Sequence, residues 1–175
     1  GITGLTFTHD GFVNIKTVPL NADTRRTLEN NLLLFFTGIS RRAEDILKRQ
    51  HTRLTQHNEV LIANLDHAKQ LAYLTRDALM EDKLKEFGLL LHEQWMLKRG
   101  RLGPSVTAFD EQINKWYALG RANGAIGGKL VGAGGGGFLL FYTEDPPRLR
   151  AAMKTAGLEE VIFRFDDEGT KVILS

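Results

Sequence analysis

The most informative stretch of the sequence is Lys129-Leu130-Val131-Gly132-Ala133-Gly134-Gly135-Gly136-Gly137-Phe138. Seven glycines fall in the segment from Gly127 to Gly137. Glycine loses more backbone freedom on folding than any other residue, so such a run is destabilising as ordinary structure. It therefore indicates a local requirement, either for positive φ angles or for close approach of the backbone to a ligand or another segment. Successive free backbone N–H groups in such a turn form a concave site for anions.

Two nucleotide-binding motifs can be tested against this glycine run. Gly132, Gly134 and Gly137 have the spacing G-x-G-x-x-G. A dinucleotide-binding loop of that kind opens a helix, whereas here the loop opens the apolar run 138–142, which predicts a strand. It is not a Walker A loop either, because no Lys-Ser or Lys-Thr follows the glycines. Two interpretations remain open: a loop that meets an anionic ligand, or a tight glycine hairpin that lets a helix pack closely.

The residues around the glycines predict a sheet covered by helices. Strands are expected at 125–131 and 138–142, then a helix over 148–156 opened by two prolines, and last strands at 161–163 and 172–174. Earlier in the chain, apolar residues recur at spacings of three and four. They predict helices over 40–54, over 61–79, from 84 to about Gly100, and from about Ser105 to Asn123. The order predicts an α+β fold, with helices packed on one face of a mostly antiparallel sheet.

The first 36 residues predict strands of a different kind. Apolar residues alternate on both sides of Thr8-His9-Asp10-Gly11, and Asp-Gly between such runs is a strong hairpin signal. A polar stretch over 21–31 follows. It precedes the solid apolar run Leu32-Leu33-Leu34-Phe35-Phe36, which predicts a buried strand.

Composition limits the class of protein. The chain has 175 residues, of which 42% are hydrophobic and 25% charged, the balance of an ordinary soluble domain. No apolar stretch reaches the roughly 18 residues that a membrane span needs, and there is no cysteine for disulfides or thiolate metal sites. The net charge is only +2, and the basic residues are interleaved with acidic ones. Both facts argue against a nucleic-acid partner. We expect a cytoplasmic protein.

The strand, Gly-Ala-Gly-Gly-Gly-Gly, strand arrangement resembles the third signature motif of the GHMP kinases. This family includes galactokinase, homoserine kinase, mevalonate kinase and phosphomevalonate kinase. Residues 33–41, His92-Glu93-Gln94-Trp95 with Lys98, and 128–137 together look most like D-glycero-D-manno-heptose phosphate kinases. The resemblance covers nearly all of the chain. It implies a ferredoxin-like C-terminal domain over 37–175, with strands in 1–36 belonging to or bordering an N-terminal domain.

The resemblance also implies that the ATP-binding half lies outside this sequence. In that family a Pro-x-x-x-Gly-Leu-Gly-Ser-Ser loop at a helix N-terminus holds most of the ATP phosphates. No such segment is present, and Gly103-Pro104-Ser105 is the nearest approach to one. The family's catalytic Asp belongs to the N-terminal domain, so we assign no catalytic base, and Asp10 in its turn is a poor substitute. Because Gly1 is not Met and opens what looks like a strand, we expect a chain cut from a longer one and inactive alone.

Candidate binding residues follow from the loop, from the turn after residue 36 and from the third helix. ATP contacts are expected at Gly132, Ala133, Gly134, Gly135, Gly136 and Gly137. Substrate contacts are expected at Thr37, Gly38, Ser40, Arg41, His92, Trp95 and Lys98. The alternatives are a capped helix start with an exposed Arg41, and a core Trp95 with surface neighbours. No protein metal site is expected, because His92 has no partners for one, and Mg²⁺ would arrive with ATP.

The resemblance implies that ATP and a heptose phosphate give a heptose bisphosphate, a precursor of bacterial surface polysaccharide. The alternatives are a fucose, galactose or mevalonate-pathway substrate, a non-catalytic ligand-binding module, and a purely structural domain. The expected partners are the substrate, ATP and an N-terminal kinase domain, with no membrane. Apolar surface left exposed without that domain would favour self-association, for example as a homodimer.

Overall fold

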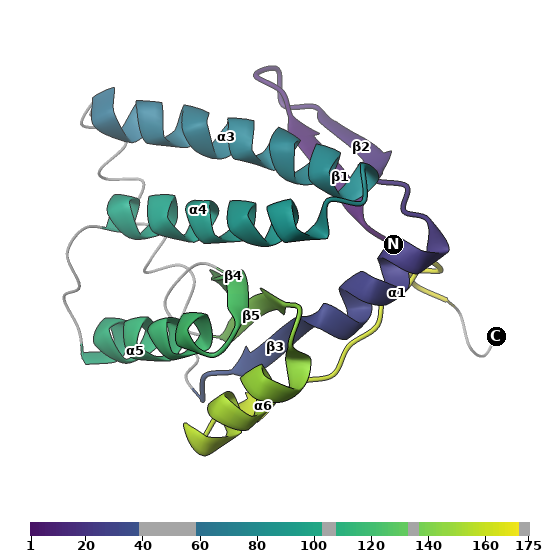
Figure 1. Cartoon of the computed structure of the whole chain (residues 1–175). Helices are drawn as coiled ribbons and strands as arrows, with labels where there is room; N and C mark the ends of the chain where they lie inside the picture. The colour runs from purple at the N-terminus through teal and green to yellow at the C-terminus, as the bar shows by residue number, and fades with distance from the viewer. Residues whose placement is uncertain (39–58, 103–107, 133–136, 172–175) are drawn as a thin grey trace.

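The computed structural model describes residues 1–38, 59–102, 108–132 and 137–171 (Figure 1). Its elements are β1 (Thr3–Phe7), β2 (Val13–Thr17), α1 (Ala22–Asn31), β3 (Leu32–Phe36), α3 (Glu59–Met80), α4 (Leu84–Leu102), α5 (Ala108–Ala122), β4 (Ala125–Val131), β5 (Phe138–Thr143), α6 (Pro146–Thr155) and β6 (Glu159–Glu160). The predicted helix over 40–54 and the predicted strand at 172–174 lie outside the described residues. None of the described helices combines the length and the apolar character that a membrane crossing requires.

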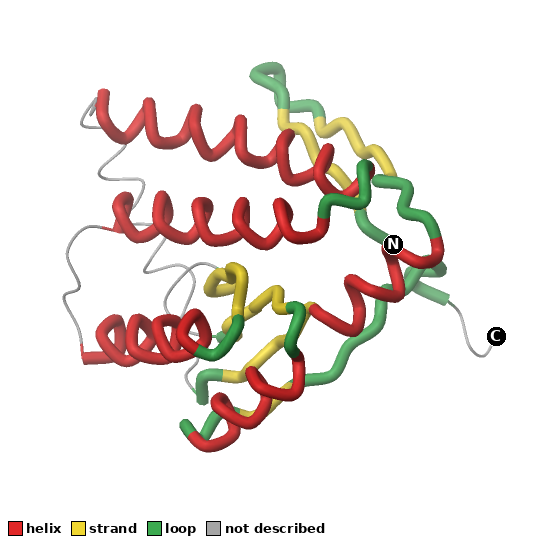
Figure 2. Tube along the Cα trace, in the orientation of Figure 1, coloured by secondary structure: helices red, strands yellow, loops and turns green. Residues whose placement is uncertain are grey.

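A four-stranded antiparallel sheet of order β4-β5-β3-β6 forms the centre of the molecule (Figure 2). β3 pairs with β5 along its whole length, from Leu32 opposite Tyr142 to Phe36 opposite Phe138. β4 pairs with the other side of β5 and ends with Val131 opposite Phe138. The glycine loop therefore connects two neighbouring strands, and the end of β3 lies beside it. The α+β fold expected from the sequence is confirmed.

Helices contribute to the packing on both faces of this sheet, because successive strand residues point to opposite sides. On one face, Leu33 and Phe35 of β3 join a buried cluster with residues of α5 and α6. On the other, Leu32 and Tyr142 join a cluster with residues of α1, α3 and α4. The expectation of helices on one face alone was therefore incomplete.

α1 forms where the sequence showed only a polar stretch. The side chain of Asn21 caps the helix, and its Oδ1 accepts a hydrogen bond from the Thr24 backbone N–H at 2.8 Å. Thr24 and Leu28 are the buried residues of this helix. So narrow a buried face leaves almost no apolar periodicity to detect.

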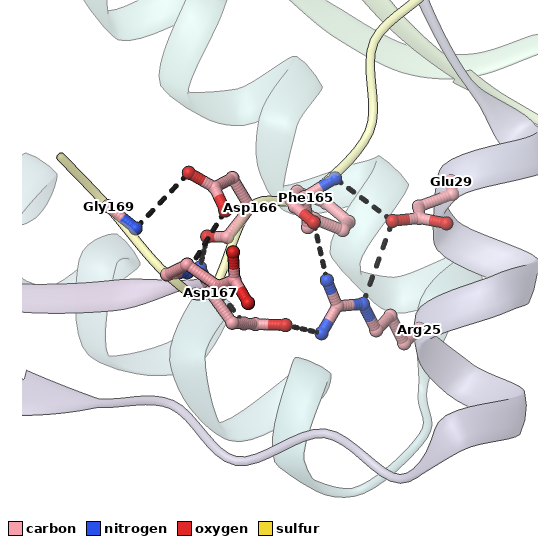
Figure 3. Close-up of polar contacts among 8 residues, drawn as sticks. Arg25, Glu29, Phe165, Asp166, Asp167 and Gly169 are labelled. Atoms are coloured by element: carbon pink, nitrogen blue, oxygen red, sulfur yellow. Dashed lines mark hydrogen bonds and ion pairs between the residues drawn. The ribbon is translucent and has the colours of Figure 1, made fainter. Parts of the chain in front are cut away.

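The strand predicted at 161–163 is wrong, since the structure has only the short β6 just before it. The Val161 N–H still donates to the Leu34 carbonyl at 2.8 Å, and the chain then leaves the sheet. Side chains of α1 replace the strand partners: Glu29 Oε1 accepts from the Phe165 N–H at 3.0 Å, and Arg25 Nη2 donates to the Phe165 carbonyl at 2.6 Å (Figure 3). Arg25 also pairs with Asp167. These contacts hold the segment against α1 instead of in the sheet.

β1 and β2 form the predicted hairpin as a separate two-stranded sheet, in register from Thr3 opposite Thr17 to Phe7 opposite Val13. The apolar side chains of this hairpin are exposed, with Phe7 at 74% and Ile15 at 69%. β3, by contrast, lies inside the four-stranded sheet. That the hairpin belongs to or borders an N-terminal domain stays a prediction. β3, which was expected on the same side of that boundary, is part of the central sheet.

Candidate functional site

The two ends of the glycine loop have backbone conformations that favour glycine. Gly132 has φ +94° and Gly137 has φ +104°, values that L residues rarely adopt. A Cβ at Gly132 would have no atom within 4 Å. Glycine at this position therefore serves the backbone conformation and not close packing. Residues 133–136, which complete the predicted ATP contacts, lie outside the described residues.

Thr37 holds the second end of the loop. Its backbone N–H donates to the Gly137 carbonyl at 2.9 Å, and its Oγ1 donates to the same oxygen at 2.8 Å. Thr37 directly follows β3 and is only 5% exposed. The ladder between β3 and β5 is thereby extended by one residue, to Gly137 at the end of the loop. Gly38, with φ +72°, turns the chain away immediately afterwards.

Lys98 of α4 holds the first end of the loop. Its ammonium donates to the Gly132 carbonyl at 2.7 Å and to the Leu130 carbonyl at 3.3 Å. From the sequence, Lys98 was expected to contact a substrate phosphate. In the structure its ammonium contacts backbone carbonyls at the start of the loop.

Gly127 and Gly88 explain another part of the glycine run. A Cβ at Gly127 would lie 1.7 Å from the carbonyl oxygen of Gly88, which no packing arrangement tolerates. At this point α4 and β4 are in backbone contact. The glycine segment thus meets both requirements suggested by the sequence, close helix packing at Gly127 and positive φ angles at Gly132 and Gly137.

His92 lies on α4, and its side chain points toward α5. Its Nδ1 is 2.8 Å from the hydroxyl oxygen of Tyr117, whose O–H donates to the Gly128 carbonyl at 3.2 Å. Burial raises the pKa of Tyr117 to about 12, so this hydroxyl stays protonated. Burial also lowers the pKa of His92, and the charge of Arg121 lowers it further. A neutral His92 with its proton on Nδ1 satisfies the Tyr117 oxygen, since the Tyr117 proton is used by Gly128.

Tyr117 was missed by sequence reasoning. It lies one turn after Ile113 on the face of α5 that also carries the predicted apolar residues, so its position alone indicates a core aromatic. Its ring is in the core, while its hydroxyl links α5 to β4.

Trp95 belongs to the core, the alternative that the sequence had left open. It is 3% exposed, and its ring centroid lies 5.4 Å from that of Tyr117. A side chain so deeply buried offers no face for a sugar to stack on, which corrects the substrate contact expected there. Ser40 and Arg41 lie outside the described residues.

Within the described ranges, no group of three or more His, Asp or Glu residues is arranged to hold a metal ion. A hollow of about 720 Å³ lies between α1 and the turn from α3 to α4, away from the glycine loop. Asn21, Asp82 and Glu144 are among its lining residues, and neither end of the glycine loop contributes to it. The candidate site therefore consists of the ends of the loop with Lys98 and Thr37, which contact them.

Comparisons with known proteins show which family and which relatives this chain is similar to. Residues 75–158 match the family of GHMP kinases C terminal. A bifunctional fucokinase/GDP-fucose pyrophosphorylase of Arabidopsis thaliana is 34% identical over 140 residues, 79% of this chain and 13% of that protein. A D-glycero-alpha-D-manno-heptose 7-phosphate kinase of Campylobacter jejuni is 30% identical over 147 residues, 82% of this chain and 42% of that protein.

Solved structures share the fold. Mevalonate kinase of L. major, in complex with R-mevalonate, superposes with a TM-score of 0.70 at 19% identity, covering 89% of this chain and 44% of that one. A D-glycero-D-manno-heptose 1-phosphate kinase of Bacteroides thetaiotaomicron gives a TM-score of 0.60 at 22% identity, covering 94% and 42%. The chain thus spans less than half the length of each of these relatives.

Proposed function

Because the chain carries the C-terminal domain of the GHMP kinases over residues 75–158, we propose that it is the C-terminal part of an ATP-dependent sugar-phosphate kinase. The proposed acceptor is D-glycero-D-manno-heptose 7-phosphate, and the product is a heptose bisphosphate for bacterial polysaccharide synthesis in the cytoplasm. The observation that carries the proposal is the glycine loop between β4 and β5, whose ends are held by Lys98 and Thr37.

In this proposal the loop forms one wall of a shared cleft. Phosphoryl transfer needs little covalent chemistry from the protein and depends on positioning and charge stabilisation. Glycines allow the backbone to approach a phosphate closely, and free N–H groups of a turn attract its negative charge. The loop from Gly132 to Gly137 would contact ATP in this way.

ATP supplies the phosphoryl group, and Mg²⁺ neutralises its charge. As the family resemblance implies, we assign Mg²⁺ and most of the phosphate contacts to an N-terminal kinase domain. No residue of this chain is assigned as the catalytic base.

The acceptor contacts are proposed at the turn after β3 and on α4. Thr37 and Gly38 form the described part of that turn, and Ser40 and Arg41 follow them in the sequence. A guanidinium such as that of Arg41 can hold a phosphate through two parallel hydrogen bonds. His92 is the remaining acceptor candidate on α4.

The experiment uses the complete gene product that contains this chain. ADP release is measured with D-glycero-D-manno-heptose 7-phosphate, L-fucose, D-galactose and mevalonate as acceptors. The heptose phosphate is expected to give the highest kcat/KM. Binding of ATP without turnover on any acceptor would contradict the kinase proposal and favour a non-catalytic module.

L-Fucose is the second candidate acceptor, because the Arabidopsis thaliana relative that includes a fucokinase has the higher identity, 34%. A kcat/KM for L-fucose at least about tenfold above that for the heptose phosphate, a difference of about 1.4 kcal/mol in transition-state binding, would replace the first candidate with it. The 175-residue chain alone is expected to show no sugar-dependent ATP hydrolysis, and turnover by pure material would contradict that expectation.

A further inference from the structure

α4 packs across one face of β4, where a Cβ at Gly127 would meet the Gly88 backbone and the Lys129 side chain reaches Gln94. β4 is at the edge of the sheet as described, and among the described strands it pairs only with β5. Contact begins where Gly88 meets Gly127 and extends to where Lys98 meets Gly132. Over these intervals the helix rises about 15 Å at 1.5 Å per residue, and the strand advances about 17 Å at 3.3–3.4 Å per residue. The two elements thus stay matched in length from the backbone contact to the loop.

Lys98 takes the place of a neighbouring strand at the end of β4. Carbonyls two residues apart in a strand point to the same side. The carbonyls of Leu130 and Gly132 therefore face the same edge, and one ammonium donates to both, at 3.3 and 2.7 Å. Hydrogen bonds from a charged donor are stronger than those between neutral groups. The start of the loop is fixed to α4 by this lysine.

Thr37 has the corresponding position at the other end. Its hydroxyl and its backbone N–H converge on one acceptor, the Gly137 carbonyl. Because Thr37 is buried and directly follows a paired strand, its own place is determined by the sheet. The two ends of the loop are thus tied to different elements, α4 and β3.

We propose that Lys98 and Thr37 are positioning residues, which act on the carbonyls at the two ends of the glycine loop and not on a substrate phosphate. Only the kinetic consequence of this inference rests on the proposed function. The two ties fix the described ends of the loop, Gly132 and Gly137, and a phosphate site that uses backbone groups needs such fixed positions. Loss of the Lys98 tie should then weaken ATP binding without altering contacts to the acceptor.

The structural test measures amide hydrogen exchange in the 175-residue chain. Lys98→Met removes the ammonium and keeps the length of the side chain. It should accelerate exchange about tenfold at the end of β4 that leads into the glycine loop, the effect of losing one charge-assisted hydrogen bond. Thr37→Val should accelerate exchange at the β5 end, and Thr37→Ser should restore the wild-type rate.

Lys115→Met is the matched control, since it removes the same charge from an exposed position on α5. An acceleration confined to one end of the loop supports positioning. A uniform acceleration over all elements, or none, overturns it, because a general loss of stability affects every protected amide.

The kinetic test uses the complete gene product with ATP and the best acceptor of the panel. Lys98→Met should raise the KM for ATP about tenfold and leave the KM for the acceptor within about twofold. A rise in the acceptor KM alone would overturn the inference and return Lys98 to the substrate phosphate. If no acceptor is phosphorylated but the exchange pattern changes as expected, the proposed function fails and the positioning stands.

Discussion

Gly127 lies where the backbones of α4 and β4 are in contact, and a substitution there tests the packing of the two elements. An alanine Cβ at this position would be 1.7 Å from the Gly88 carbonyl oxygen, so helix and strand must separate. We expect Gly127→Ala to lower the free energy of unfolding by about 3 kcal/mol or more, as overpacked cores do. The measurement is urea denaturation.

Gly4→Ala is the control for this substitution. Gly4 is also a strand glycine, but its Cβ would lie 3.6 Å from the Lys16 carbonyl oxygen, an ordinary contact. Its effect should stay within about 1 kcal/mol, because glycine is slightly unfavourable in a strand. Equal losses in the two variants would contradict the close contact between α4 and β4.

His92 predicts a pH dependence of stability. Its pKa is lowered in the folded chain, first by burial and then by Arg121, from an ordinary value of 6.5. The neutral form is therefore favoured by folding. The stability contributed by His92 is fully present above pH 6.5 and is lost as the pH falls through the lowered folded value, because the unfolded chain then binds more protons.

Urea denaturation of the wild type and of His92→Gln at about pH 7.5 and about pH 5 measures this effect. The wild type should lose more stability over the interval than the variant. The other histidines are present in both proteins, so their contributions cancel in the comparison. An equal loss in both would show that His92 is not held neutral.

Part of the candidate site could be predicted from residue types and spacing. Lys98 and Thr37 were singled out from the sequence as substrate contacts, and in the structure they contact the two ends of the glycine loop. What spacing could not decide was the direction of each side chain. Trp95 and Lys98 are three apart on one helix, yet one is in the core and the other at the loop.

At the scale of elements, the start of α1 joins two parts of the chain. Asn21 caps α1 through Thr24, and its Nδ2 donates to both carboxylate oxygens of Asp82 at 2.9 and 2.8 Å. Asn21→Ala should lower the free energy of unfolding by about 1–2 kcal/mol, the upper part of the range for a lost N-cap. Thermal or urea denaturation measures the change.

Asn30→Ala supplies the comparison within the same helix. Asn30 is exposed, and alanine has the higher helix propensity, so the substitution should be neutral or slightly stabilising. A destabilisation matching that of Asn21→Ala would show that the cap and its link to Asp82 contribute nothing particular.

Elements with a strong apolar pattern could be predicted, and those held by polar contacts could not. β3, β4 and β5 are buried apolar strands, and the pattern indicated each of them. α1 has a buried face too narrow to leave a period. The apolar residues after β6 predicted a strand, but Glu29 and Arg25 take the backbone groups of Phe165, a tertiary contact that no local pattern contains.

At the scale of the whole molecule, the hairpin of β1 and β2 has an exposed apolar face. Leu5 pairs with Ile15 and Phe7 with Val13, so these four side chains share one side of the hairpin, and all are exposed. We expect Phe7→Thr combined with Ile15→Thr to reduce self-association in sedimentation velocity. Stability should change by no more than about 0.5 kcal/mol, as for other exposed positions, because threonine keeps a high strand propensity.

The opposite side of the hairpin supplies the control. Thr6 pairs with Asn14 there, and replacing both with alanine should leave self-association unchanged. If both double variants dissociate equally, the apolar face is not the surface through which copies associate.

The contact of Lys98 with the outward carbonyls of β4 has a consequence for misassembly. With Lys98 engaging the carbonyls of Leu130 and Gly132 and β6 reduced to Glu159–Glu160, the described four-stranded sheet offers little template for strands from another molecule. Neither outer edge of the β1–β2 hairpin pairs with another strand among the described residues, so this hairpin is the expected seed for cross-β growth. Fibrils of this chain, digested with a protease, should leave a resistant core that contains residues 3–17, while residues 125–143 are cleaved.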